Sequence, residues 1–182
     1  MKIDELKTPR LWLRAWRDED LDAHAALNAD PRVMEFFPAT RTRAESDASA
    51  ALIAKHFAER GFGFWVLEVP GVLPFAGLVG LNVMTIDAHF TPALEVGWRL
   101  ARDAWGQGYA TEAARACLDY AFDERGYDEV VAVTAVQNAR SRRVMEKLGM
   151  THDPAENFEH PSVPEGNWLR EHVLYRARVE AR

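Results

Sequence analysis

The stretch Trp105-Gly106-Gln107-Gly108-Tyr109-Ala110-Thr111-Glu112 lies between a predicted strand and a predicted helix. Its two glycines let the backbone turn sharply and approach a ligand closely, because neither carries a Cβ. The first amides of the helix that follows have no acceptor inside the helix, and the helix dipole adds positive potential there. Such a terminus favours a bound phosphate or pyrophosphate. By itself the pattern fits an ordinary tight strand-to-helix turn equally well, since glycine also suits left-handed turn positions.

Two other phosphate-binding motifs are excluded by spacing. The P-loop pattern G-x-x-x-x-G-K-S/T does not occur in the chain. The Rossmann pattern G-x-G-x-x-G lacks its third glycine here, and no long parallel strand array follows.

The elements on both sides of this stretch are predicted from periodicity. In the strand expected over residues 93–101, apolar side chains alternate with Glu95, Gly97 and Arg99, which therefore share the opposite face. Small and apolar residues recur at helical spacing over 109–125, where Gly126 ends the helix. A continuous apolar run over 130–136 is typical of a buried strand.

The whole chain of 182 residues reads as a single domain, residues 1–182, without repeats or linkers. We expect an α+β (mixed α/β) sheet domain with helices on both faces and the order β-α-α-β-β-β-α-β-α-β. The remaining strands are expected at 11–16, 64–69, 75–84 and 170–178, and the remaining helices at about 18–28, 44–60 and 139–148.

The segment from Trp105 to Ala113 resembles the acetyl-CoA pyrophosphate loop of the GNAT superfamily, and its RimJ/RimL-type branch in particular. That branch typically reads W-G-x-G-Y-A-T-E-A, and every position agrees. The wider superfamily pattern is Q/R-x-x-G-x-G/A, from which Trp105 departs while Gly108 and Ala110 conform. The resemblance implies a GNAT-like, mostly antiparallel twisted sheet with one splayed parallel pair.

A second segment, residues 137–150, resembles the family's N-x-x-S-x-x-x-x-E-K-L-G-F/M pattern. The resemblance implies that Asn138 binds the pantetheine arm and that Arg142 lies near the phosphates. The alternative for Asn138 is an ordinary helix N-cap. Together, the resemblance places acetyl-CoA, as co-substrate, against Trp98, Arg99, Leu100, Trp105, Gly106, Gln107, Gly108, Tyr109, Ala110, Thr111, Asn138, Ser141 and Arg142, with Trp98 to Leu100 acting through their backbone.

The resemblance also implies catalytic roles in acetyl transfer from acetyl-CoA to a primary amine. Glu95 matches the acidic residue that serves as base, and its alternative is a solvent-facing strand glutamate. Ser141 matches a serine that approaches the sulfur as acid, and its alternative is a helix serine that caps backbone amides. Many GNAT enzymes use a later tyrosine, a position that is Met145 here. A non-catalytic CoA-binding sensor or interaction domain is the competing function.

The composition of the chain restricts the classes of partner that we expect. The net charge of −6 disfavours nucleic acid, and an amine acceptor, either a small molecule or a protein N-terminus, suits an acidic surface. The single cysteine, Cys117, and the absence of a signal-peptide core or apolar span indicate a cytoplasmic protein without a membrane partner. We expect no metal site, with His152, His160 and His172 on the surface or in loops. Homodimerisation is compatible with the resemblance.

Overall fold

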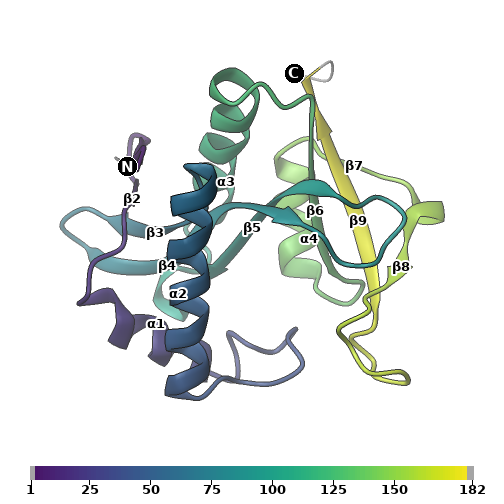
Figure 1. Cartoon of the computed structure of the whole chain (residues 1–182), viewed down its shortest axis with the longest axis horizontal. Helices are drawn as coiled ribbons and strands as arrows, with labels where there is room; N and C mark the ends of the chain where they lie inside the picture. The colour runs from purple at the N-terminus through teal and green to yellow at the C-terminus, as the bar shows by residue number, and fades with distance from the viewer. Residues whose placement is uncertain (1–2, 180–182) are drawn as a thin grey trace.

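The computed structural model describes residues 3–179, which form one mixed sheet with helices on both faces (Figure 1). The sheet order is β1-β2-β3-β4-β5-β6-β9-β7, with β8 also pairing with β9. The strands are β1 Leu6–Lys7, β2 Trp12–Arg14, β3 Phe64–Val69, β4 Leu73–Met84, β5 Ala93–Leu100, β6 Glu129–Ala135, β7 Thr151–His152, β8 Phe158–Glu159 and β9 Glu171–Arg178. The helices are α1 Asp20–Ala29, α2 Arg43–Arg60, α3 Tyr109–Asp119 and α4 Ala139–Lys147, with short 3-10 turns η1 Arg102–Ala104 and η3 Pro154–Glu156 and a π turn η2 Tyr120–Glu124.

All neighbouring strands pair antiparallel except β5 and β6. Those two are parallel, and they pair at Glu95 and Val131 alone. Toward Leu100 and Ala135 the two strands separate, and Figure 1 shows β6 and β9 crossing the molecule at a steep angle to β3 and β4. The expected GNAT-like sheet with one splayed parallel pair is therefore confirmed.

The alternation predicted for β5 assigns its side chains to the two helix layers. Leu94, Val96 and Leu100 belong to the buried apolar core, which also contains Ala113 and Cys117 of α3. On the opposite face, the Arg99 guanidinium donates a hydrogen bond to the Asn28 side chain of α1. Figure 1 accordingly shows α1 and α2 in front of the sheet and α3 and α4 behind it.

The helix predicted over 109–125 is regular only as far as Asp119. It continues as the π turn η2, in which the Arg125 amide donates to the Tyr120 carbonyl at 3.1 Å. Three consecutive side chains of this turn, Tyr120 to Phe122, are buried. The strands β1, β7 and β8 were not predicted, because two residues are too few to show a period.

Gly80 of β4 is required by close backbone packing. A Cβ at this position would lie 2.1 Å from the Gly63 carbonyl oxygen and 2.5 Å from Phe64 Cα. Backbone atoms cannot rotate away, so we expect Gly80→Ala to lower the free energy of unfolding by about 3 kcal/mol, the upper range for overpacking. Urea denaturation measures this quantity.

The matched control is Gly97→Ala, on the residue that pairs with Gly80 across the sheet. Its Cβ would meet only the Phe64 ring, at 3.0 Å, and a side chain can shift. Equal losses of stability in the two variants would contradict the explanation.

Candidate active site

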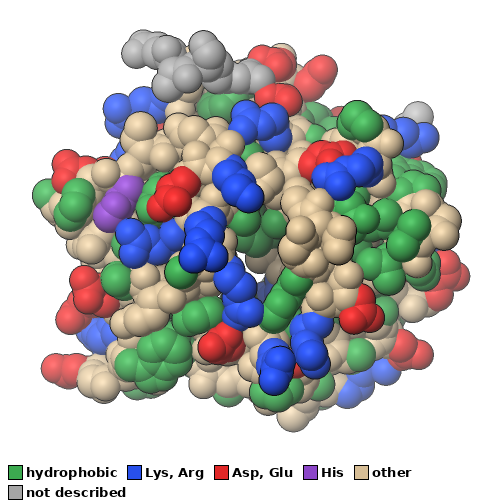
Figure 2. Space-filling model, turned by 180° about the vertical axis from the view of Figure 1, so that it is seen from behind, with side chains coloured by type: hydrophobic (Ala, Val, Ile, Leu, Met, Phe, Trp, Pro, Cys, Tyr) green, Lys and Arg blue, Asp and Glu red, His purple; other side chains and the backbone are tan. Residues whose placement is uncertain are grey.

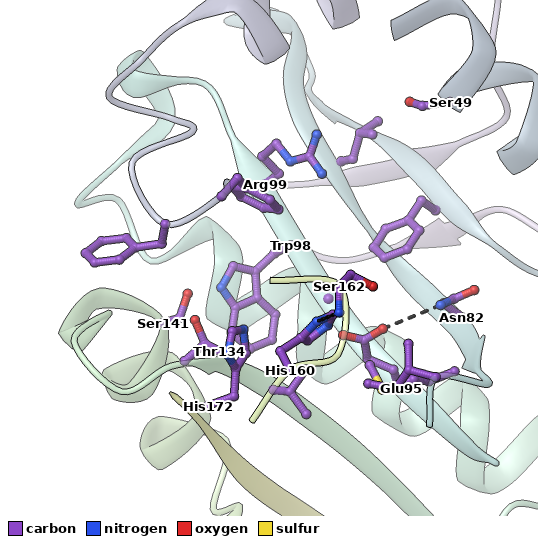
Figure 3. Close-up of a pocket in the computed structure, with 18 of the residues that line it drawn as sticks. Ser49, Asn82, Glu95, Trp98, Arg99, Thr134, Ser141, His160, Ser162 and His172 are labelled. Atoms are coloured by element: carbon purple, nitrogen blue, oxygen red, sulfur yellow. Dashed lines mark hydrogen bonds between the residues drawn. The ribbon is translucent and has the colours of Figure 1, made fainter. Parts of the chain in front are cut away.

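A cavity of about 840 Å³ lies between the sheet, α2 and the loops that precede α2 and β9 (Figure 3). It opens beside the point where β5 and β6 separate, because Glu95, Trp98 and Arg99 of β5 line it together with Val133 and Thr134 of β6. The other polar lining residues are His24, Arg41, Ser49, His56, Asn82, Thr85, Asn138, Ser141, His160, Ser162 and His172.

Glu95 projects into this cavity from the one residue of β5 that pairs with β6 (Figure 3). Desolvation by the surrounding protein raises the pKa of its carboxyl group to about 7, against a smaller opposing effect of a hydrogen bond from Asn82. The Asn82 Nδ2 to Glu95 Oε2 distance is 3.5 Å. The sequence prediction of a carboxylate facing a site therefore agrees with the geometry, and Glu95 exchanges a proton near neutral pH.

Ser141 and Asn138 meet the cavity at the N-terminus of α4. Asn138 is the N-cap, since its Oδ1 accepts from the Ser141 amide at 3.2 Å. Its Nδ2 donates to the hydroxyl oxygens of Thr134 at 2.9 Å and Ser141 at 3.1 Å. The Ser141 oxygen thus accepts a hydrogen bond and keeps its own O–H free to donate. The N-cap alternative for Asn138 is confirmed, and one Oδ1 lone pair remains for a ligand.

The glycine-containing stretch that opens α3 has the backbone that the sequence predicted. Gly106 and Gly108 have φ of 75° and 80°, which only glycine adopts without strain. The first hydrogen bond into the helix runs from the Glu112 amide to the Gly108 carbonyl. The amides from Tyr109 to Thr111 have no acceptor among the described residues, so the helix presents free donors to an anion.

A second contact holds this stretch in place, and the sequence analysis did not foresee it. The Glu112 carboxylate accepts hydrogen bonds from the Thr8 hydroxyl at 2.6 Å and from Nε of Arg10 at 2.7 Å. The Arg10 guanidinium also donates to the Gln107 carbonyl at 3.1 Å and lies over the Tyr109 ring. The residues before β2 therefore support the loop from outside.

The end of β5, where sequence analysis predicted cofactor contacts from Trp98 to Leu100, lies next to the loop that opens α3. Beyond Glu95, the strand has no pairing with β6, so the backbone from Trp98 to Leu100 is open toward the gap on that side. The Trp105 indole donates to the Leu100 carbonyl at 2.9 Å, which ties the loop to the strand end. Arg142, by contrast, donates to the Val136 carbonyl at 3.2 Å and contacts the Tyr175 hydroxyl, so its predicted phosphate role remains a prediction.

Comparison with known proteins identifies this arrangement. The acetyltransferase (GNAT) domain family matches residues 10–151, most of the chain. The chain belongs to this family. GNAT acetyltransferases use acetyl-CoA, and the loop, the gap and the carboxylate described above lie within the matched residues.

Relatives of this GNAT chain cover most of its length. The uncharacterized protein YkkB of Bacillus subtilis is 34% identical over 149 residues, covering 80% of this chain and 84% of that protein. The FsC-acetyl coenzyme A-N(2)-transacetylase of Aspergillus fumigatus is 36% identical over 154 residues, covering 81% of this chain and 65% of that protein. A solved acetyltransferase from Agrobacterium tumefaciens has a TM-score of 0.79 and 26% identity, covering 98% and 96% of the two chains.

The surface behind the sheet of this GNAT domain is basic although the chain is acidic overall. Figure 2 shows Lys and Arg side chains gathered around a hollow near the centre of that face. Exposed basic residues of α3, α4 and the turn before α3 are Arg102, Arg115, Arg140, Arg143 and Lys147. Such a surface attracts phosphates.

Sequence analysis missed a cluster of buried polar residues on α1 and α2, of which His24 lines the cavity. His24, Asn28 and Ser46 are almost fully buried, and Asn28 Nδ2 donates to Ser46 Oγ at 3.1 Å. The signal was present: His24 and Asn28 lie four residues apart, on the side of α1 that faces the sheet, where apolar residues are expected. Asn82, likewise, interrupts an apolar strand.

The prediction that the later histidines lie on the surface or in loops is wrong for His172. Its side chain is buried in β9 and lines the cavity beside His160, with the two rings 4.8 Å apart. Desolvation lowers the pKa of His172 to about 4. Cys117 is buried as expected, and desolvation raises the pKa of its thiol.

Residues 3–179 contain neither a metal-binding cluster nor a membrane-spanning helix. No group of three or more His, Cys, Asp or Glu side chains there could hold a metal ion. None of the helices in that range is both long and apolar enough to cross a membrane.

Asn82 provides a test of the electrostatics at Glu95. Asn82→Leu keeps the number and branching of the side-chain heavy atoms but removes the donor that stabilises the carboxylate, so the pKa of Glu95 should rise above its value of about 7. A ¹³C NMR titration of the Glu95 carboxyl carbon measures the shift. Asn157→Leu, whose partner is His152 outside the cavity, should leave this pKa unchanged. A lower pKa in Asn82→Leu would refute the assignment.

Proposed function

We propose that this protein transfers the acetyl group of acetyl-CoA to a primary amine by direct attack within a ternary complex. The observation that supports the proposal most strongly is Glu95, whose carboxyl group has a pKa of about 7 and faces the cavity at the point where β5 leaves β6. A carboxylate with that pKa accepts a proton at neutral pH, which an alkylammonium must lose before it can attack.

In the proposed reaction, Glu95 takes a proton from the acceptor amine, directly or through water. The amine nitrogen forms a bond to the acetyl carbon and releases a second proton to solvent as the carbon–sulfur bond breaks, and the electron pair of that bond goes to sulfur. The Ser141 hydroxyl donates its proton to the leaving thiolate and is reprotonated from solvent. Its oxygen accepts from Asn138, and this bond orients the O–H toward the cavity.

Acetyl-CoA fits the residues that the sequence predicted. The free amides of Tyr109, Ala110 and Thr111, with the turn Trp105 to Gly108 before them, suit its diphosphate. The edge of β5 at Trp98, Arg99 and Leu100 does not pair with β6 and suits the pantetheine amides, which would extend the sheet in the gap, although the Leu100 carbonyl already accepts from the Trp105 indole. Asn138 retains an acceptor for the same arm. The basic surface of α3 and α4 suits the remaining phosphate.

The proposed branch of the family and the proposed acceptors rest on the sequence motif and on the relatives. The match at all eight specified positions of the pattern from Trp105 to Ala113 supports the RimJ/RimL-type branch. The proposed acceptors are protein N-termini and small amines, and the name of the Aspergillus relative refers to acetyl transfer to an N(2) nitrogen. Cytoplasmic location and homodimerisation remain predictions.

A non-catalytic CoA-binding domain is the competing function. The raised pKa of Glu95 favours catalysis, because burying a carboxyl group without a counter-ion costs stability and serves no purpose in a CoA sensor. A domain that binds CoA and acetylates none of a broad panel of amines would support the sensor instead.

Substitution of Glu95 tests the base. Glu95→Gln should lower kcat about 100-fold and abolish the rise of kcat with pH that we expect of the wild type up to about pH 7, where Glu95 loses its proton. Thiol release at fixed, saturating acceptor measures both, and Ser141→Ala should lower kcat by about tenfold or more. Glu171→Gln, at an exposed carboxylate of β9, is the control and should match the wild type. A retained pH inflection in Glu95→Gln would assign the base elsewhere.

Substitution of Gly108 tests the diphosphate site. Alanine at φ of 80° is strained by roughly 1–2 kcal/mol, so the loop should move and the Kd for acetyl-CoA should rise about tenfold. Calorimetry measures the Kd. The control is Gly126→Ala, which has a φ of 69° beyond the other end of the helix and no atom within 4 Å of the added Cβ. An unchanged Kd in Gly108→Ala would argue against this loop as the binding site.

A further inference from the structure

We propose that the acceptor amine carries an anionic group, which Arg99 and Arg41 bind in the part of the cavity away from Glu95. The inference rests on the proposed acetyl transfer and adds the substrate class.

The first observation is the environment of Arg99. Its Nη1 donates to the Asn28 side-chain oxygen, and its guanidinium lies 4.5 Å from the centre of the Phe37 ring. Its Nε is buried and has no hydrogen-bond partner. A guanidinium has five N–H donors, and burying it without a carboxylate is costly. An anion entering the cavity would satisfy those donors.

The second observation is Arg41, another cation in the lining of the same cavity. Neither Arg41 nor Arg99 forms an ion pair within residues 3–179. Desolvation and then repulsion from Arg41 lower the pKa of Arg99 to about 10, so the side chain remains charged at neutral pH. Two unpaired guanidinium groups give this part of the cavity a positive potential.

The other titratable groups of the lining do not cancel that potential. Desolvation lowers the pKa of each lining histidine, to about 4 for His24, so the histidines are neutral at pH 7. Glu95 is the one acidic side chain in the lining. A polyamine would therefore meet repulsion near Arg99, whereas a carboxylate or phosphate would match the planar fork of its donors.

Strand geometry separates the anion from the amine. Glu95 and Arg99 are four residues apart on one face of β5, which places their Cα atoms about 13 Å apart at 3.3 Å per residue. Gly97 between them leaves the floor of the cavity without a side chain. Figure 3 shows the two side chains well apart, Glu95 beside Asn82 and Arg99 toward Ser49. The acceptor therefore needs a spacer of several bonds, which an α-amino acid with both groups on one carbon lacks.

The test is a panel of matched acceptors in the thiol-release assay. We expect kcat/KM for 6-aminohexanoate to exceed that for hexylamine at least tenfold, with 1,6-diaminohexane and glycine lower still. In the same panel, 6-aminohexyl phosphate distinguishes a phosphate from a carboxylate as the preferred anion, and preference for either one supports the inference.

Variants assign the preference to the arginines. Arg99→Met should reduce the ratio of kcat/KM between 6-aminohexanoate and hexylamine to about one through a higher KM for the anionic acceptor, and Arg99→Lys should restore part of it. Arg43→Met, which removes an exposed arginine paired with Asp22 and Asp47 outside the cavity lining, should keep the wild-type ratio. If Arg99→Met does not fold, Arg41→Met tests the same ratio.

The failures are distinguishable. If hexylamine is acetylated as well as 6-aminohexanoate, or if Arg99→Met keeps the wild-type ratio, the anion site is refuted while the proposed function stands. If acetyl-CoA binds but no amine in the panel is acetylated, the proposed function fails. Calorimetry with 6-acetamidohexanoate then decides the anion site: binding to the wild type and not to Arg99→Met supports it, and equal behaviour refutes it.

Discussion

The separation of β5 from β6 is the constraint on which the rest of the structure depends. The two strands share one pairing, at Glu95 and Val131, and then diverge. A sheet normally satisfies every backbone donor and acceptor of an interior strand. The unpaired edge of β5 beyond Glu95 therefore lowers the stability of the free protein, and an extended ligand that pairs with this edge would restore the lost hydrogen bonds. The same divergence makes room for the cavity, which Asn138 and Ser141 line at the N-terminus of α4.

Two charged side chains of the cavity, Glu95 and Arg99, project from the same face of β5. Glu95 and Arg99 are both desolvated, yet they do not pair with each other, because the pleat holds them four residues apart. Each therefore keeps unsatisfied interactions that a ligand carrying an amine and an anion would complete. In our interpretation, these unsatisfied groups lower the stability of the free protein and make it select acceptors that satisfy them.

Contacts distant in sequence hold the other half of the site. Burial alone would raise the pKa of Glu112, but hydrogen bonds from Thr8 and Arg10 outweigh it and lower the pKa, so the carboxylate stays charged. It anchors residues a hundred positions earlier to the first turn of α3. The Trp105 indole donates to the Leu100 carbonyl and so holds the loop against the end of β5. A diphosphate would thus meet donors whose positions are already set.

Local patterns in the sequence predicted the longer helices and strands and part of the candidate site, but not β1, β7, β8 or the π turn. Alternation in β5 assigned Glu95 and Arg99 to one face, and the glycines at 106 and 108 predicted the left-handed turn before α3, because period and backbone freedom are properties of neighbouring residues. Tertiary structure decided what depends on distant residues. It alone showed that Glu95 is desolvated, that Asn82 lines the cavity beside it, that Asn28 contacts Arg99, that His172 is buried, and that Arg99 lacks a counter-ion among the described residues, since burial and pairing are set by segments that meet only in the folded chain.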